Sequence, residues 1–228
     1  MGINADFARR VAIDTRAMPW SPSPMPGVDR RMLDRIGEEK ARATSIVRYA
    51  PNSSFPSHRH PGGEELFILE GVFEDEHGSY PAGTYVRNPP GTAHAPASTD
   101  GCVIFVKLWQ FDPQDDVPVR IDTPEAPFTS AGAPHGSTQL LLHVGPQETV
   151  RLLRLPAETK ITLSARDGLE ILVLDGAVRI DGDGLTQQGW WRGREEKDVS
   201  VTSGDDDALI YAKSGHLAHV RFPDDVAV

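Results

Sequence analysis

Three histidines and one glutamate in the first half of the chain have the types and spacing that suit a metal ion. His58 and His60 are separated by one residue, so on a strand both imidazoles would point to the same face. Glu64 follows a Pro-Gly-Gly bend, and His94 follows a Pro-Pro-Gly turn signal. Three imidazoles and one carboxylate suit a divalent first-row transition metal. Any one of these histidines alone would more often be an ordinary turn or surface residue, so the prediction depends on the four together.

The four residues fall into the two sequence motifs of the cupins, which the chain therefore resembles. The first motif reads G(x)5HxH(x)3,4E(x)6G, and the second reads G(x)5PxG(x)2H(x)3N. The matching residues are His58, His60, Glu64 and Gly71 in the first motif, and Gly83, Pro89, Gly91 and His94 in the second. Asn52 replaces the opening Gly of the first motif, and Ser98 replaces the closing Asn of the second. Neither position is a ligand, so the implied metal centre survives both departures.

Within the cupins, the chain is most similar to the ChrR-type family. The segments that carry this similarity are residues 58–71, 80–91 and 106–110, and about residues 40–112 are covered closely. The family includes the C-terminal domain of the anti-sigma factor ChrR and relatives of 2,4'-dihydroxyacetophenone dioxygenase. The resemblance implies that His58, His60, Glu64 and His94 hold one divalent transition metal. Fe or Zn is expected first, with Mn or Ni as alternatives.

Glu65 leaves a second choice of carboxylate ligand open. It directly follows Glu64, and on an extended strand the two side chains would face opposite sides. The motif spacing to Gly71 favours Glu64. In the alternative, Glu65 points inward and Glu64 caps the loop.

Lys107 is the candidate catalytic residue outside the ligand set. It stands in an apolar strand beside Val106 and Leu108, where a cation needs a partner or an open cavity. Further residues that could line a pocket are Tyr85, Arg87, Trp109, Phe55, Phe67 and Phe105. Core packing explains Trp109 and the phenylalanines, and a surface ion pair explains Arg87. Cys102 is expected to be a small buried apolar residue.

The pattern of short apolar runs and frequent turns predicts an all-β protein built as a duplicated cupin barrel, a bicupin of jelly-roll type. The segment ending at Gly71 and the segment ending at Gly176 resemble each other, which indicates the duplication. We expect an extended N-terminal segment over residues 1–40 that packs on the barrel. A metal-binding cupin domain over 41–115, a linker over 116–137 and a second, metal-free cupin domain over 138–228 should follow.

The second half lacks the metal ligands. Superposing Gly176 on Gly71 places Leu163, Ala165 and Leu169 where the first half has His58, His60 and Glu64. Ser200 stands near the position expected for the last histidine. His216 and His219 form another pair, without a carboxylate or third imidazole nearby in sequence, and are expected to be surface or tail residues.

Composition excludes several classes of function. The formal net charge of −10 and the absence of a basic patch argue against nucleic-acid binding. One cysteine rules out an intramolecular disulfide and a cysteine-based zinc cluster. No signal-like or membrane-spanning run is evident, so no membrane contact and a cytoplasmic location are expected. A homodimer is compatible with the family.

Two kinds of function fit these residues. The first is a mononuclear metal enzyme, by resemblance a dioxygenase that cleaves a small carbonyl compound with Fe(II). The second is a regulatory or sensor cupin that binds zinc or a small ligand. It would act without the helical zinc domain of ChrR, because that domain's His-xxx-Cys-xx-Cys pattern is missing here.

Overall fold

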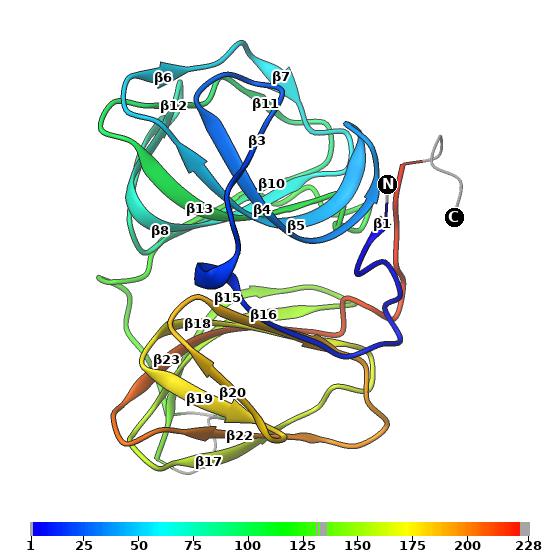
Figure 1. The fold of residues 1–228 in the computed structure, drawn as a ribbon, viewed down its shortest axis with the longest axis vertical. Coiled ribbons are helices and arrows are strands. Elements are labelled where there is room, and N and C mark those ends of the chain that lie inside the picture. Colours follow the sequence, from blue (N-terminus) through cyan, green and yellow to red (C-terminus); the bar gives the residue numbers. More distant parts are fainter. Residues whose placement is uncertain (1, 131, 133–135, 224–228) are drawn as a thin grey trace. The chain divides into compact units, whose positions relative to one another are not determined.

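The computed structural model describes residues 2–130, 132 and 136–223, which fold into two compact units (Figure 1). Of these residues, the first unit takes 2–5, 19–125 and 221–223, and the second takes 6–18 and 126–220. The regular elements among the described residues are β-strands, apart from the 3-10 turn η1 (Thr15–Ala17). None of these described segments is a helix with the length and apolar character needed to cross a membrane.

The first unit is a β-barrel of antiparallel strands. Its strands are β1 (Gly2–Ile3), β3 (Ser21–Pro22), β4 (Val28–Gly37), β5 (Ala41–Tyr49), β6 (Ser53–Ser54), β7 (His58–Arg59), β8 (Glu64–Asp75), β9 (Gly78–Pro81), β10 (Thr84–Asn88), β11 (Ala93–His94), β12 (Ala97–Ser98), β13 (Cys102–Leu108) and β14 (Val119–Asp122). The main sheet has the order β1-β4-β5-β13-β8-β10-β14, and β7 pairs with β11 in a two-stranded ribbon. The second half of β8 also pairs with β9 and β12.

The second unit repeats this arrangement. Its strands are β2 (Val11–Asp14), β15 (Thr138–Val144), β16 (Thr149–Leu155), β17 (Lys160–Leu163), β18 (Leu169–Asp175), β19 (Ala177–Ile180), β20 (Asp183–Thr186), β21 (Gly189–Gly193), β22 (Val199–Ser203) and β23 (Ala208–Ser214). The order β15-β16-β23-β18-β21-β2 matches β4-β5-β13-β8-β10-β14 strand for strand, and β17-β22 matches β7-β11. The predicted all-β duplicated barrel is therefore confirmed.

A glycine with positive φ bends the corresponding strand in each unit. Gly71 has φ 71° and Gly176 has φ 73°. A Cβ at Gly71 would collide with the carbonyl oxygen of Gly101, and one at Gly176 with that of Asp207. Glycine is required at both positions because it alone combines this conformation with such a close backbone approach.

The motif departure at Asn52 has a conformational explanation. Asn52 adopts φ 58°, and its N–H donates to the carbonyl oxygen of Thr99 at 2.9 Å. Asparagine is among the few residues that tolerate this left-handed region, so it replaces the motif glycine without loss of the turn. At the second departure, Ser98 is buried and its hydroxyl donates to the Val72 carbonyl oxygen at 2.7 Å.

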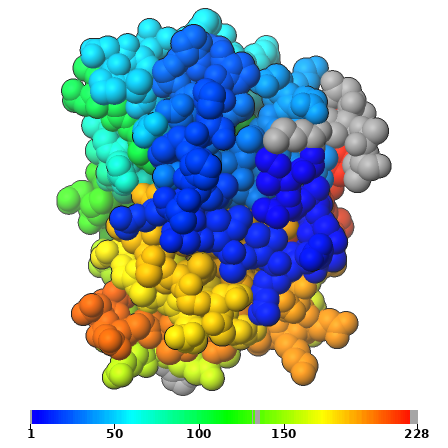
Figure 2. All heavy atoms as spheres, viewed as in Figure 1, coloured from blue at the N-terminus to red at the C-terminus, as the bar shows by residue number. Residues whose placement is uncertain are grey.

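The structure divides the chain differently from the sequence-based expectation. Residues 1–40 are not one extended segment, because they include the ten-residue strand β4, and residues 6–18 belong to the second unit through β2. Figure 2 shows N-terminal residues, in blue, on the molecular surface. Residues 116–137 are not only a linker, since β14 pairs with β10 at the edge of the first sheet. Both differences involve strands that need a distant partner, which local sequence patterns do not reveal.

Candidate metal centre

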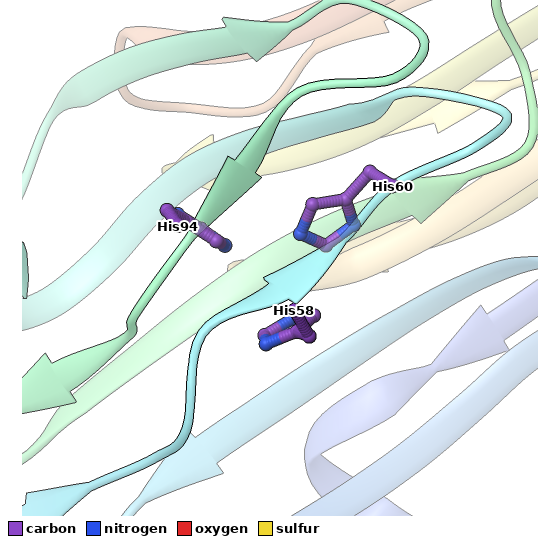
Figure 3. Close-up of side chains that lie close together, drawn as sticks. All are labelled: His58, His60 and His94. Carbon is purple, nitrogen blue, oxygen red and sulfur yellow. The ribbon is translucent and has the colours of Figure 1, made fainter.

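The ribbon of β7 and β11 brings the three motif histidines together. His58 lies opposite His94 in the register of the two strands. His60 follows β7, where its N–H donates to the Thr92 carbonyl oxygen and its own carbonyl oxygen accepts from Gly91. One ring nitrogen from each histidine lies within 4.8 Å of the others. Figure 3 shows the three rings gathered around a common space.

Glu64, at the start of β8, lies beside two of the three histidines. Its Oε2 lies 3.5 Å from His60 Nε2 and 3.3 Å from His94 Nε2. The same oxygen accepts a hydrogen bond from Asn88 Nδ2 at 3.0 Å, which fixes the carboxylate. Asn88 lies opposite Glu64 in the register between β10 and β8, so the sheet itself places this partner.

Glu65 points to the other side of the strand and is committed elsewhere. Its Oε2 accepts from Arg87 Nη1 at 3.0 Å, and both side chains are buried. Because successive side chains alternate across a strand, the two glutamates cannot both face the histidines. The geometry therefore favours Glu64 as the carboxylate of the candidate centre.

Asp75 orients His94 from behind. Its buried carboxylate Oδ2 lies 3.2 Å from His94 Nδ1, and Oδ1 accepts from the Tyr80 hydroxyl at 3.1 Å. A carboxylate in this position holds the proton on Nδ1 and leaves the Nε2 lone pair for a metal. The Nδ1 of His58 has a corresponding partner, the carbonyl oxygen of Pro56 at 3.2 Å.

Asp75→Asn should lower metal affinity about 10- to 100-fold, the usual cost of losing such an outer carboxylate. The reason is that asparagine cannot balance the charge on His94 when its ring binds a cation. Equilibrium dialysis against zinc would measure the change. Glu74→Gln is the matched control, because the Glu74 carboxylate accepts from Thr99 instead. Equal loss in both variants would contradict the role given to Asp75.

The ring nitrogens of His60 and His94 that approach Glu64 are suited to bind a metal ion. The Nε2 atoms of His60 and His94 are buried and make no hydrogen bond, although both approach the Glu64 carboxylate. Burial lowers the pKa of His60, more strongly than the nearby Glu64 raises it, so the ring is neutral at neutral pH. Buried polar atoms left without partners cost free energy, and a shared cation would satisfy them. The donor set therefore suits a divalent transition metal.

The candidate centre lies in the wall of a cavity of about 530 Å³ in the first unit. Apolar side chains of β4, β5 and β13 form much of this wall, together with Tyr49 and Phe55. The apolar members are Val28, Val47, Ile104, Val106 and Leu108. A cavity of this size and character suits a small organic ligand.

Lys107 does not share this cavity. Val106 and Leu108 line it, so Lys107, between them on β13, faces the opposite side. Lys107 lies beside Glu65 in the register, and its Nζ donates to Thr44 Oγ1 at 3.1 Å. The expected catalytic role is therefore not supported, because the lysine is on the wrong face of the strand.

The second unit explains why a lysine stands there. Glu65, Arg87 and Lys107 lie side by side across three strands, and Glu170, Arg192 and Lys213 occupy the corresponding register positions. All six side chains are buried. Because the same charged set also occurs in the unit that lacks metal ligands, we interpret it as a structural feature of the barrel and not as part of the metal centre. It also corrects the expectation for Arg87, whose ion pairs with Glu65 and Asp115 are buried rather than on the surface.

Of the other residues that could line a pocket according to the sequence, some line the cavity and some lie on the opposite face of their strands. Phe55 and Trp109 line the cavity. Phe67 and Phe105 lie opposite each other on β8 and β13, on the face that carries Lys107. Tyr85 is fully buried outside the cavity wall. Cys102 is a buried free thiol, as expected, and burial raises its pKa to about 11.

Apolar packing fills the corresponding place in the second unit. Leu163, Ala165 and Leu169 are buried members of one hydrophobic cluster. Leu163 pairs with Val199, as His58 pairs with His94, so the last ligand position corresponds to Val199 rather than to Ser200. The sequence also suggests that Gly189 is the counterpart of Gly83. The hydrogen bonds instead match Gly83 with Gln188, since Gly83 N–H donates to the Ile68 carbonyl oxygen and Gln188 N–H to that of Val173. These one-residue differences arise because strand pairing, not spacing, sets equivalence.

The expectation that His216 is a surface residue is wrong. His216 is buried, and its Nε2 lies 3.2 Å from Glu170 Oε2. Glu170 Oε1 also accepts from Trp190 Nε1 at 2.6 Å. His219 is exposed, as expected. His216, distant in sequence, therefore joins Arg192 and Lys213 around the buried Glu170.

Sequence analysis missed three residues that support the centre: Asp75, Asn88 and Arg120. Arg120, on β14, donates to Asn88 Oδ1 at 2.5 Å and so holds the amide that contacts Glu64. Its strand lies in the segment expected to be a linker. Asp75 and Asn88 are each the last residue of a strand in the motif region, which is the only local feature that could have indicated them. Their partners His94 and Glu64 are distant in sequence.

Comparisons with known proteins agree with this geometry. Residues 8–112 match the family model of the ChrR cupin-like domain. Among curated protein sequences, none matches the chain. The matched residues include all four candidate ligands, His58, His60, Glu64 and His94.

Solved structures share the fold at low sequence identity. A proposed dioxygenase from Nostoc punctiforme has a TM-score of 0.77 and 15% identity, covering 96% of this chain and 86% of its own. The Escherichia coli pirin YhhW, in complex with nickel(II), has a TM-score of 0.66 and 14% identity, covering 91% and 99%. An oxalate decarboxylase has a TM-score of 0.62 and 10% identity, covering 90% and 76%. The chain therefore has the duplicated cupin-barrel fold, and its residues 8–112 match the ChrR cupin-like domain.

Proposed function

We propose that the protein is a mononuclear metal-dependent enzyme that cleaves a small carbonyl compound oxidatively, in the manner of a dioxygenase. The observation that carries the proposal is the pair of buried Nε2 atoms, on His60 and His94, that make no hydrogen bond, next to an apolar cavity that His58, His60 and Glu64 line. The fold shared with a proposed dioxygenase is consistent with it.

Four side chains would hold the metal: His58, His60, Glu64 and His94. Fe(II) or Zn(II) is proposed first, and the nickel(II) complex of the pirin shows that a protein of this fold takes other divalent ions. A bound metal would supply a Lewis-acid centre and, if it is iron, a redox centre as well.

The chain's own residues prepare the site for this chemistry. Asn88 and Asp75 fix Glu64 and His94, so the donors are held in place before any ligand enters. The apolar wall of β4, β5 and β13 limits water around the donors and strengthens electrostatic interactions with a substrate. Tyr49 lies in the same wall with its ring edge against Phe55, and burial raises the pKa of its hydroxyl, which stays protonated.

Metal analysis and oxygen uptake test the proposal. Protein purified without oxygen should contain about one iron per chain. With small diketones or hydroxyacetophenones, it should consume one O2 for each substrate cleaved, since one oxygen atom enters each fragment. The His94→Ala protein is the control and should show no uptake. Stoichiometric zinc without uptake would contradict the oxygenase and favour the sensor. Absence of any metal would contradict the enzyme and leave only a cupin that binds a small ligand.

A further inference from the structure

Arg30 places a positive charge in the wall of the metal-site cavity. Its side chain lines the cavity, and its Nε is buried without a hydrogen bond. Across the part of the chain that the structure describes, no carboxylate forms an ion pair with Arg30. A buried guanidinium nitrogen left without an acceptor is costly, so its presence in this wall needs an explanation.

Strand register fixes the direction of this side chain. Arg30 on β4 lies opposite Val47 on β5, and Val47 lies opposite Ile104 on β13. Val47 and Ile104 both line the cavity, as does Val28, two positions before Arg30. Arg30 is therefore the one charged member of an otherwise apolar row on the inner face of the sheet.

The other charged groups that line the cavity form no ion pair with Arg30 in the part of the chain that the structure describes. Glu64 lies beside His60 and His94, and its Oε2 accepts from Asn88. Arg59 donates to the carbonyl oxygen of Gly91. Glu39 and Lys40 also line the cavity, and the Glu39 charge acts on Arg35. The pKa of Arg35 is lowered, first by burial and then by the positive charge of Arg30, so the surroundings of Arg30 include a second cation. An anion from outside the chain would complement this region.

We propose that Arg30 binds the carboxylate of a small organic acid, whose apolar body occupies the cavity and whose keto or hydroxyl oxygen faces His58, His60, Glu64 and His94. The proposal rests on the proposed function and narrows its substrate class to keto or hydroxy acids. A guanidinium suits this role because its planar donors match the two oxygens of a carboxylate. The cavity of about 530 Å³ accommodates an acid of this kind with a branched aliphatic or a phenyl group.

Calorimetric titration with 4-methyl-2-oxopentanoate and with its methyl ester tests the proposal. The two probes differ in the charge that Arg30 would recognise. Metal-free wild-type protein should bind the acid about tenfold more tightly than the ester. Arg30→Met should remove this difference by weakening the acid about tenfold and leaving the ester unchanged. Arg30→Lys, which keeps the charge, should retain part of the preference.

Arg31→Met is the matched control. Arg31 is the next residue on the same strand, but its guanidinium lies over the Trp20 ring, 4.0 Å from the centroid. This variant should bind both probes as the wild type does. Equal binding of acid and ester by the wild type would overturn the proposal, as would an acid preference that persists in Arg30→Met.

The same titrations with zinc-loaded protein separate this inference from the proposed function. If the chain binds no metal but Arg30→Met loses the acid preference, the enzyme proposal fails and the carboxylate site stands. If metal binds and carbonyl compounds are cleaved, but the acid preference does not depend on Arg30, the carboxylate site fails alone. In zinc-loaded protein a carboxylate could bind the metal directly, so the metal-free measurement decides the role of Arg30.

Discussion

His94→Ala should release nearly all bound metal from the protein. His94 is the proposed ligand that contacts both carboxylates, since its ring lies between Glu64 Oε2 and Asp75 Oδ2. Losing a directly coordinating imidazole should cost more than about 100-fold in affinity, because outer partners alone are worth 10- to 100-fold. Elemental analysis after dialysis would measure the metal content, with about one ion per chain expected in the wild type.

His219→Ala is the control for this change. His219 is an exposed histidine of the second unit, where the ligand positions are apolar. It should keep the wild-type metal content. Retention of metal by His94→Ala, or its loss from His219→Ala, would overturn the ligand assignment. Circular dichroism of both variants would establish that any loss is not due to unfolding.

Glu64→Gln and Glu65→Gln should separate metal binding from stability. Glu64→Gln removes the charge beside His60 and His94, so metal affinity should fall at least about tenfold while the fold remains. Glu65→Gln removes the carboxylate partner of buried Arg87, and an uncompensated buried charge costs about 3–5 kcal/mol of unfolding free energy. Asp115 also pairs with Arg87, which places the expected loss near the lower end.

Urea unfolding and equilibrium dialysis on both variants give the two readouts. The two substitutions are chemically identical and adjacent in sequence, so each is the control for the other. Loss of metal from Glu65→Gln with full stability would reverse the assignment. The alternation of side chains across β8 is the physical reason that the two effects should not mix.

Much of the candidate centre could be predicted from the sequence because its signals are local. His58 and His60 share a face through the two-residue period of a strand, and the turn at Gly62 and Gly63 directly precedes β8. Gly71 and Gly176 marked the duplication because both positions need a backbone conformation and a close approach that only glycine permits. Local rules of this kind do not depend on which strands later become neighbours.

The sequence did not reveal which distant residues would become partners. Asp75, Arg120 and His216 each act through a residue far away in the chain, and their pairing follows from sheet order. The face of Lys107 was also beyond the sequence, since its apolar neighbours were compatible with either side of the sheet. Only the register of β13 against β8 shows that Val106 and Leu108 face the cavity and Lys107 faces Glu65.

The sequence by itself therefore predicted the three histidines of the candidate centre, the all-β duplicated fold and the apolar residues at the ligand positions of the second half, through residue types and short spacings. The tertiary structure alone decided that Glu64 rather than Glu65 faces the histidines and that Arg30 lines the cavity. It also decided that β2 pairs with a strand of the second unit and β14 with a strand of the first. The reason is physical. A strand's alternation is written in its own residues, but which of its two faces is interior depends on the strands that pair with it.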